Sequence, residues 1–160
     1  MCNGRIMIAG TNSGCGKTTV VCGLLKCLLN RKMNIHAFKC GPDYIDTSFH
    51  KKVLKIPTGN LDSWFCKPED LRKIVSKKAD KCDIAVIEGV MGYYDGMGFT
   101  QRASAYEIAD ITSTPVILII NCKGMSSSLK AVLSGFVNMK QNSHIKGVIF
   151  NRLSEKLYCQ

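Results

Sequence analysis

Short apolar segments alternate with amphipathic ones along the 160-residue chain. Runs rich in Ile, Val and Leu are typical of strands that are buried on both faces of a parallel sheet. Five such runs predict strands over 5–9, 35–39, 84–88, 116–121 and 146–150. Helical spacing of apolar residues between them predicts helices over 17–31, 68–78, 103–112 and 126–140. This alternation predicts an α/β fold: a doubly wound, mostly parallel sheet with helices on both faces and ligands at the carboxyl ends of its strands.

The segment 40–62 interrupts the alternation. Gly41-Pro42 and Gly59-Asn60 are turn signals, and no long periodic run separates them. The segment is nevertheless too rich in aromatic and aliphatic residues for disorder. Long loops in compact domains are usually functional. We therefore expect a folded loop that contacts the substrate.

A glycine-rich run joins the first predicted strand to the first predicted helix. Backbone N–H groups of such a loop curl around a polyphosphate, and the helix N-terminus adds its positive dipole end. Lys17 would reach the outer phosphates, and Thr18 would offer its hydroxyl to Mg²⁺. The motif is a variant, because its first glycine is Gly10 where the usual spacing requires one at position 11. ATP and Mg²⁺ are the predicted cofactors, and the predicted nucleotide-binding residues of the loop are Thr11, Asn12, Ser13, Gly14, Cys15, Gly16, Lys17, Thr18 and Thr19.

Charged residues follow the second and third predicted strands, whose carboxyl ends lie at the same edge of the sheet as the phosphate loop. Lys39 ends the second strand, and Glu88 ends the third at a Walker B-like position facing the Mg²⁺ held by Thr18. Lys17, Lys39 and Mg²⁺ would stabilise the charge that develops in phosphoryl transfer. The predicted metal ligands are Thr18, Asp46 and Glu88, with Asp43 beside them. The candidate catalytic residues are Lys17, Lys39, Asp43, Asp46, Glu88 and Asp95.

Each acid also has a structural alternative. Glu88 would then be an ordinary carboxylate at a strand end. Asp43 and Asp46 would form an Asx-type turn beside Pro42. The dense glycines of the segment 89–96 favour a ligand near Glu88, since they allow close backbone approach.

Length and composition restrict the kind of protein in which this site occurs. The length suits one domain over residues 1–160. No apolar stretch approaches the roughly 20 residues that span a bilayer, and no signal peptide is evident, so a cytoplasmic protein is predicted. The nine cysteines are scattered without metal-ligand spacing and predict reduced thiols. The net charge of +10 comes from dispersed lysines, which favours a solvated surface or a polyanionic small substrate over nucleic acid or membrane partners.

Four motifs resemble the ATP-dependent synthetase domain of the cobyrinic acid a,c-diamide synthase family, a relative of dethiobiotin synthetase. The phosphate loop is the first of them. Lys39-Cys40-Gly41-Pro42-Asp43-Tyr44-Ile45-Asp46 is similar to the family signature KxGPDYID, and Asn60-Leu61-Asp62-Ser63-Trp64 to its NLD segment. Glu88-Gly89-Val90-Met91-Gly92-Tyr93-Tyr94-Asp95-Gly96 resembles the block EGVMGLYDG. The resemblance extends over residues 6–152 and implies the P-loop fold of dethiobiotin synthetase.

The resemblance implies an amidoligase of cobalamin biosynthesis. ATP would phosphorylate the a- and c-carboxylates of cobyrinic acid to acyl phosphates, and ammonia would displace the phosphate. Asp43, Asp46, Glu88 and Asp95 match family acids that handle nucleotide, metal and substrate, while Asn151 matches the asparagine that reads adenine. An ordinary polar strand end is the alternative for Asn151. A tetrapyrrole bearing many carboxylates would also account for the basic net charge.

The chain departs from the family pattern in three places. The family's glutaminase domain, which supplies ammonia from glutamine, has no counterpart in residues 1–160. The chain would be a fragment of a longer enzyme, a short homologue using free ammonia, or half of a split pair; a second copy forming a homodimer is a further candidate partner. Asn121 stands where relatives often have Asp, and the stretch 101–105 differs from their Gly-Ser-Thr-Ala, which leaves substrate contacts near Ser104 open.

Two other functions remain as alternatives. Dethiobiotin synthetase activates a carbamate through a similar loop, but the Gly-Pro-Asp-Tyr-Ile-Asp segment argues against it. A switch ATPase of the partition type would bind DNA or membrane. Such proteins usually carry a lysine early in the phosphate loop, where this chain has Asn12. The sequence does not separate a cobalt corrinoid from a nickel-containing tetrapyrrole.

Overall fold

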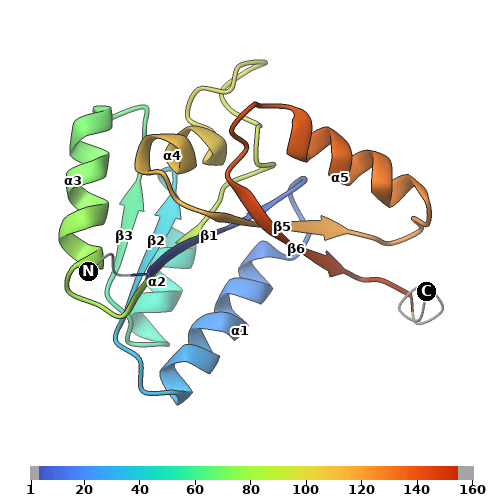
Figure 1. Ribbon diagram of the computed structural model, residues 1–160. Helices are drawn as coiled ribbons and strands as arrows, with labels where there is room; N and C mark the ends of the chain where they lie inside the picture. Colours follow the sequence, from blue (N-terminus) through green and yellow to red (C-terminus); the bar gives the residue numbers. More distant parts are fainter. Residues whose placement is uncertain (1–3, 155–160) are drawn as a thin grey trace.

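Residues 4–154 are described by a computed structural model, and within this range they form a six-stranded sheet and five helices (Figure 1). The strands are β1 (Gly4–Gly10), β2 (Ile35–Cys40), β3 (Thr58–Leu61), β4 (Ile84–Glu88), β5 (Val116–Asn121) and β6 (Ile145–Asn151). The helices are α1 (Lys17–Asn30), α2 (Tyr44–Lys52), α3 (Pro68–Ala79), α4 (Ala105–Thr112) and α5 (Ser128–Asn138).

All neighbouring strands pair in parallel, in the order β3-β2-β4-β1-β5-β6. The chain moves from β1 outward to one edge of the sheet, returns through β4, and then builds the other edge with β5 and β6. This is the predicted doubly wound arrangement. Its carboxyl edge, where ligands bind in open parallel sheets, carries the phosphate loop after β1.

The two faces of the sheet are buried under different helices. Alternation along β1 sends Ile8 into a cluster with Val21 and Leu25 of α1, while Met7 and Ala9 join a second cluster that includes residues of α3 and α4. The side chains of both clusters are almost fully buried. The sheet is therefore held firmly from both sides, and the carboxyl ends of its strands have fixed relative positions.

The expected loop over 40–62 is wrong in part, because this segment contains α2 and β3. Asp43 begins α2 as its N-cap, and its Oδ1 accepts the N–H of Ile45 at 2.9 Å. β3 adds to the edge of the sheet beside β2, with Leu61 fully buried. The strand escaped prediction because its four residues, Thr-Gly-Asn-Leu, contain no apolar run. The helix predicted from 103 begins at Ala105, after the N-cap Ser104.

Within residues 4–154, no helix combines the length and the apolar character needed to span a bilayer. The ends of the predicted single domain, 1–3 and 155–160, lie outside the described residues.

Candidate functional site

The phosphate loop connects β1 to α1 with a backbone that needs glycine. Gly14 and Gly16 have φ angles of 74° and 103°, in the left-handed region. A Cβ at Gly10 would collide with the sulfur of Cys15, which explains why this variant loop has its first glycine at that position. The loop borders a cavity of about 300 Å³, lined by Gly14, Gly16, Lys17, Thr18, Thr19 and Arg152.

Lys17 is buried at the start of α1. Among the described residues, the oxygen atoms that accept hydrogen bonds from its ammonium group are uncharged backbone carbonyls. Its Nζ donates to the carbonyl oxygen of Asn12 at 3.0 Å and to that of Met91. Met91 has a φ of 46°, an uncommon backbone conformation for a residue with a side chain. Burial lowers the pKa of Lys17. The loop therefore holds a cation that an anion could compensate better than these carbonyls do.

Lys39 and Glu88 are cross-strand neighbours in the register of β2 and β4. The Nζ of Lys39 lies 2.8 Å from Oε1 of Glu88 and 2.6 Å from Oδ2 of Asp46, in the first turn of α2. The hydroxyl of Thr18 donates to the same Oε1 at 2.7 Å. We refer to Thr18, Lys39, Asp46 and Glu88 as the acid cluster. The structure thus brings together the three predicted metal ligands with one predicted catalytic lysine.

Electrostatics in the acid cluster differ from those in the loop. Burial by itself would lower the pKa of Lys39, but attraction to Glu88 and hydrogen bonds to Asp46 and Glu88 outweigh it and leave the pKa raised. Glu88 is fully buried, and Lys39 is 5% exposed. A buried carboxylate needs such a partner, since desolvation of an isolated ion is costly.

The donor set of the acid cluster fits Mg²⁺. The second carboxylate oxygen of Glu88, Oε2, is buried without a hydrogen-bond partner among the described residues. It lies on the same carboxylate as the oxygen that the Thr18 hydroxyl contacts, and Asp46 contributes a second carboxylate. No three His, Cys, Asp or Glu side chains in residues 4–154 converge into a metal site of their own. The two carboxylates of the acid cluster suit Mg²⁺, which is commonly held by one or two carboxylates with substrate phosphates and water.

Asp43 and Asp95 have local structural contacts. Asp43 caps α2, as the turn alternative expected, and its Oδ2 remains 3.8 Å from Nζ of Lys39. Asp95 is exposed, and its Oδ2 accepts the N–H of Gly92 at 3.0 Å. It therefore closes a turn in the segment after β4 and does not join the acid cluster in this structure.

Asn151 ends β6 beside the phosphate loop. Its Nδ2 donates to the carbonyl oxygen of Cys15 at 2.8 Å, and its Oδ1 accepts the N–H of Arg152 at 3.0 Å. The amide nitrogen thus holds the loop while the amide oxygen bonds to the following residue, and the reading of adenine stays a prediction. Sequence reasoning missed Arg152, which lines the loop cavity. The sequence feature that could have indicated Arg152 is its position as a cation shortly after the end of a predicted strand.

Glu107 is another residue that the sequence analysis missed. Its Oε2 accepts the N–H of Ala103 at 2.7 Å and the hydroxyl of Ser63, so it joins the segment after β3 to the segment before α4. Its own N–H donates to Ser104 at 3.1 Å, and Ser104 is fully buried. The spacing Ser-x-x-Glu before an apolar run could have indicated this helix start. Ser104, near which the sequence left the substrate contacts undecided, therefore acts as the N-cap of α4.

Large exposed apolar side chains occur on the three segments that leave β2, β3 and β4 at the carboxyl edge. We call them the apolar rim: Tyr44, Ile45, Phe49, Trp64, Phe65, Met91, Met97 and Phe99. The guanidinium of Arg102 lies 4.4 Å from the centre of the Trp64 ring. Exposed apolar groups concentrated around one edge indicate a binding surface.

The loop, the parallel sheet and the acid cluster define a P-loop nucleotide-binding domain. Residues 6–158 match the family described as the CobQ/CobB/MinD/ParA nucleotide binding domain, and the chain belongs to this family.

Curated relatives with similar sequences include several enzymes of one kind within this class of proteins. The chain is 41% identical over 157 residues to the cobyrinate a,c-diamide synthase of Priestia megaterium, covering 98% of this chain and 34% of that protein. It is 44% identical over 157 residues to the enzyme of the same name from Limosilactobacillus reuteri (strain DSM 20016), covering 96% of this chain and 34% of that protein. The chain thus spans about a third of the length of these relatives. The resemblance inferred from the motifs is confirmed.

Solved structures support the fold. The BceF tyrosine kinase domain superposes with a TM-score of 0.65 at 12% identity, over 91% of this chain and 67% of that one. The signal recognition particle receptor FtsY from Elizabethkingia anophelis gives a TM-score of 0.63 at 12% identity, over 87% and 48%. At such low identity the likeness concerns the fold alone.

Proposed function

We propose that this chain is the ATP-dependent synthetase region of a cobyrinate a,c-diamide synthase. The observation that carries the proposal is the acid cluster beside the phosphate loop, in a chain that is 41–44% identical to enzymes of that name. The reaction would convert substrate carboxylates to amides at the expense of ATP. Its place in cobalamin biosynthesis follows from the relatives' substrate.

The residues have distinct roles in this proposal. Thr18, Asp46 and Glu88 would hold Mg²⁺, which supplies charge neutralisation for the phosphates when bound. Lys17 would exchange its carbonyl partners for phosphate oxygens. Lys39, released from Asp46 when the carboxylates turn to the metal, would stabilise the equatorial charge of the phosphoryl group in transfer.

Two chemical steps complete the reaction. A substrate carboxylate oxygen attacks the γ-phosphorus, the bond to the β-γ bridging oxygen breaks, and ADP leaves with its electron pair. Ammonia then adds to the acyl carbon, inorganic phosphate departs, and a proton lost from nitrogen leaves a neutral amide. The ammonia would come from a glutaminase domain or subunit. The greater length of the relatives leaves room for such a domain.

The apolar rim supports a large substrate. Aromatic and aliphatic side chains from α2 and from the segments after β3 and β4 would contact the face of a tetrapyrrole. The net charge of +10 would favour its peripheral carboxylates. A small carbamate substrate, as in a dethiobiotin synthetase-type ligase, would leave most of this rim without a role.

The proposal is tested by supplying the chain with Mg²⁺, ATP, ammonium and cobyrinic acid. We expect ADP release that depends on cobyrinic acid and a product in which two carboxylates have become amides, measured by mass spectrometry. The Lys17→Ala protein is the inactive control, and Lys26→Ala, an exposed lysine elsewhere on α1, is the matched active one. ATP turnover that ignores cobyrinic acid but responds to DNA or lipid vesicles would instead favour a switch ATPase.

A further inference from the structure

β1 carries a charged side chain on the face of the sheet that packs against α3 and α4, where most of the buried side chains are apolar. Met7 and Ala9 of this strand belong to the cluster beneath α3 and α4, and alternation places Arg5 on the same face. β1 is an interior strand, paired with β4 and β5. The Nε atom of Arg5 is buried without a hydrogen-bond partner among residues 4–154, and none of the ion pairs found in that range includes Arg5.

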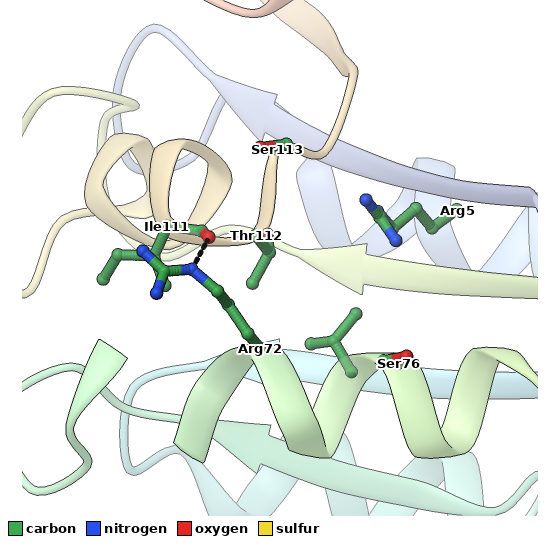
Figure 2. A pocket seen from close by; sticks show the side chains of 7 residues that line it. Arg5, Arg72, Ser76, Ile111, Thr112 and Ser113 are labelled. Atoms are coloured by element: carbon green, nitrogen blue, oxygen red, sulfur yellow. Dashed lines mark hydrogen bonds between the residues drawn. The ribbon is translucent and has the colours of Figure 1, made fainter. Parts of the chain in front are cut away.

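Arg5 borders a cavity of about 230 Å³ between the sheet, α3 and the end of α4 (Figure 2). Figure 2 shows its guanidinium on one side of this cavity, with Arg72 and Ser76 on α3 and the last turn of α4 around the remainder. No Asp or Glu is among the described lining residues, which are Arg5, Arg72, Val75, Ser76, Ile111, Thr112 and Ser113.

The two arginines are in different electrostatic situations. Arg72 donates its Nε–H to the carbonyl oxygen of Ile111 at 3.0 Å, so its charge compensates the negative end of the α4 dipole. The buried Nε of Arg5 has no such partner in the part of the chain that the structure describes. A buried donor without an acceptor is costly. The hydroxyl of Ser76 lies at the long distance of 3.5 Å from Asp80 and could turn to another acceptor.

We propose that this cavity binds an oxyanion, a phosphate or carboxylate group carried by a small free molecule. The planar guanidinium of Arg5 matches such groups with parallel N–H donors, and the cavity provides the space for a group of this size. Arg5 and Gly10 stand near opposite ends of β1, about 16 Å apart at the usual rise of a strand. The site is therefore separate from the phosphate loop, and it does not depend on the function proposed above.

The test uses the Lys17→Ala protein as parent, because phosphate would otherwise also bind at the phosphate loop. Inorganic phosphate and acetate are titrated separately by calorimetry. We expect saturable binding of at least one of them, weakened about tenfold or more by a second change, Arg5→Met. Lys26→Met removes the same charge from exposed α1 and should leave the affinity unchanged. Binding of phosphate alone or acetate alone identifies the group that the cavity prefers.

Thermal unfolding with and without the anion provides a second, independent measurement of binding. Without the anion, Arg5→Met should unfold at a temperature no lower than its parent, because a buried donor without an acceptor has gone. With the anion, the parent should gain stability and Arg5→Met should not. Equal anion binding by Arg5→Met and Lys26→Met, or no binding of either anion by the parent, would overturn the proposal. If Arg5→Met does not fold, Arg5→Lys tests it instead, with weaker anion binding expected because the fork of donors is lost.

Discussion

The phosphate loop and the acid cluster lie at the same edge of the sheet but balance their lysines in opposite ways. Lys17 is held by backbone carbonyls, and burial lowers its pKa. Lys39 is held by two carboxylates that leave its pKa raised in spite of burial. The comparison supports a loop that can receive an anion and an acid cluster in which one lysine faces two carboxylates, so that a further cation could bind there.

The largest expected difference between the two regions is the loss of folding stability when the lysine of each is replaced. Lys39→Met leaves Glu88 buried without its cation, and we expect a loss of about 3 kcal/mol or more in the free energy of unfolding. Lys17→Met removes a charge that burial already disfavours, so the loss should be far smaller. Urea unfolding of both variants measures the difference. Equal losses would show that the two lysines do not differ as described.

Glu88→Gln should separate nucleotide binding from turnover. The amide keeps the size of the side chain but loses the negative charge that would place Mg²⁺. We expect roughly a hundredfold loss in turnover with ATP affinity in the absence of Mg²⁺ nearly unchanged, on the scale of losing one electrostatic contact in a transition state. Steady-state kinetics and calorimetry provide the two readings. Wild-type turnover in this variant would remove Glu88 from the mechanism.

The two aspartates of α2 provide a finer contrast. Asp43→Ala should cost about 1 kcal/mol of stability through loss of the N-cap, with a minor effect on turnover. Asp46→Asn should lower turnover about tenfold or more with little change in the melting temperature, because it removes a charge beside Lys39 and keeps the helix. The contrast would fail if Asp46→Asn lowered the melting temperature while turnover stayed the same.

The smallest effect concerns pH. A lysine with a raised pKa contributes stability that is fully present below its ordinary pKa of 10.5 and is lost as the pH rises through the raised value. The difference in unfolding free energy between the wild type and Lys39→Met should therefore be constant up to about pH 10.5 and shrink above it. Urea unfolding over an alkaline pH series checks this. A difference that grew with pH would contradict the assigned direction.

The parts that the sequence predicted share a local cause. The phosphate loop could be located because glycine requirements and the flanking apolar runs are readable within a short window. The approach of Lys39 to Glu88 followed from two parallel strands ending at one edge. These predictions needed only the element order and the periodicity of neighbouring residues.

The parts that escaped prediction depend on contacts between distant segments. β3 is a strand because β2 offers an edge to pair with, which its own four residues do not reveal. The bond from Lys17 to Met91 requires a left-handed residue in the segment after β4. The contact between Ser63 and Glu107 joins the segment after β3 to the first turn of α4, which is far away in the chain. Tertiary contacts of this kind have no signature in a short window of sequence.

The central claim is that the phosphate loop and the acid cluster form one site for Mg²⁺ and ATP. Calorimetric titration of the full chain with ATP, with and without Mg²⁺, tests it most directly. Affinity should increase when Mg²⁺ is added to the wild type, and this increase should be lost in Glu88→Gln, while Lys17→Ala should bind poorly in both conditions. Absence of ATP binding by the folded wild type, or an equal Mg²⁺ effect in Glu88→Gln, would contradict the account.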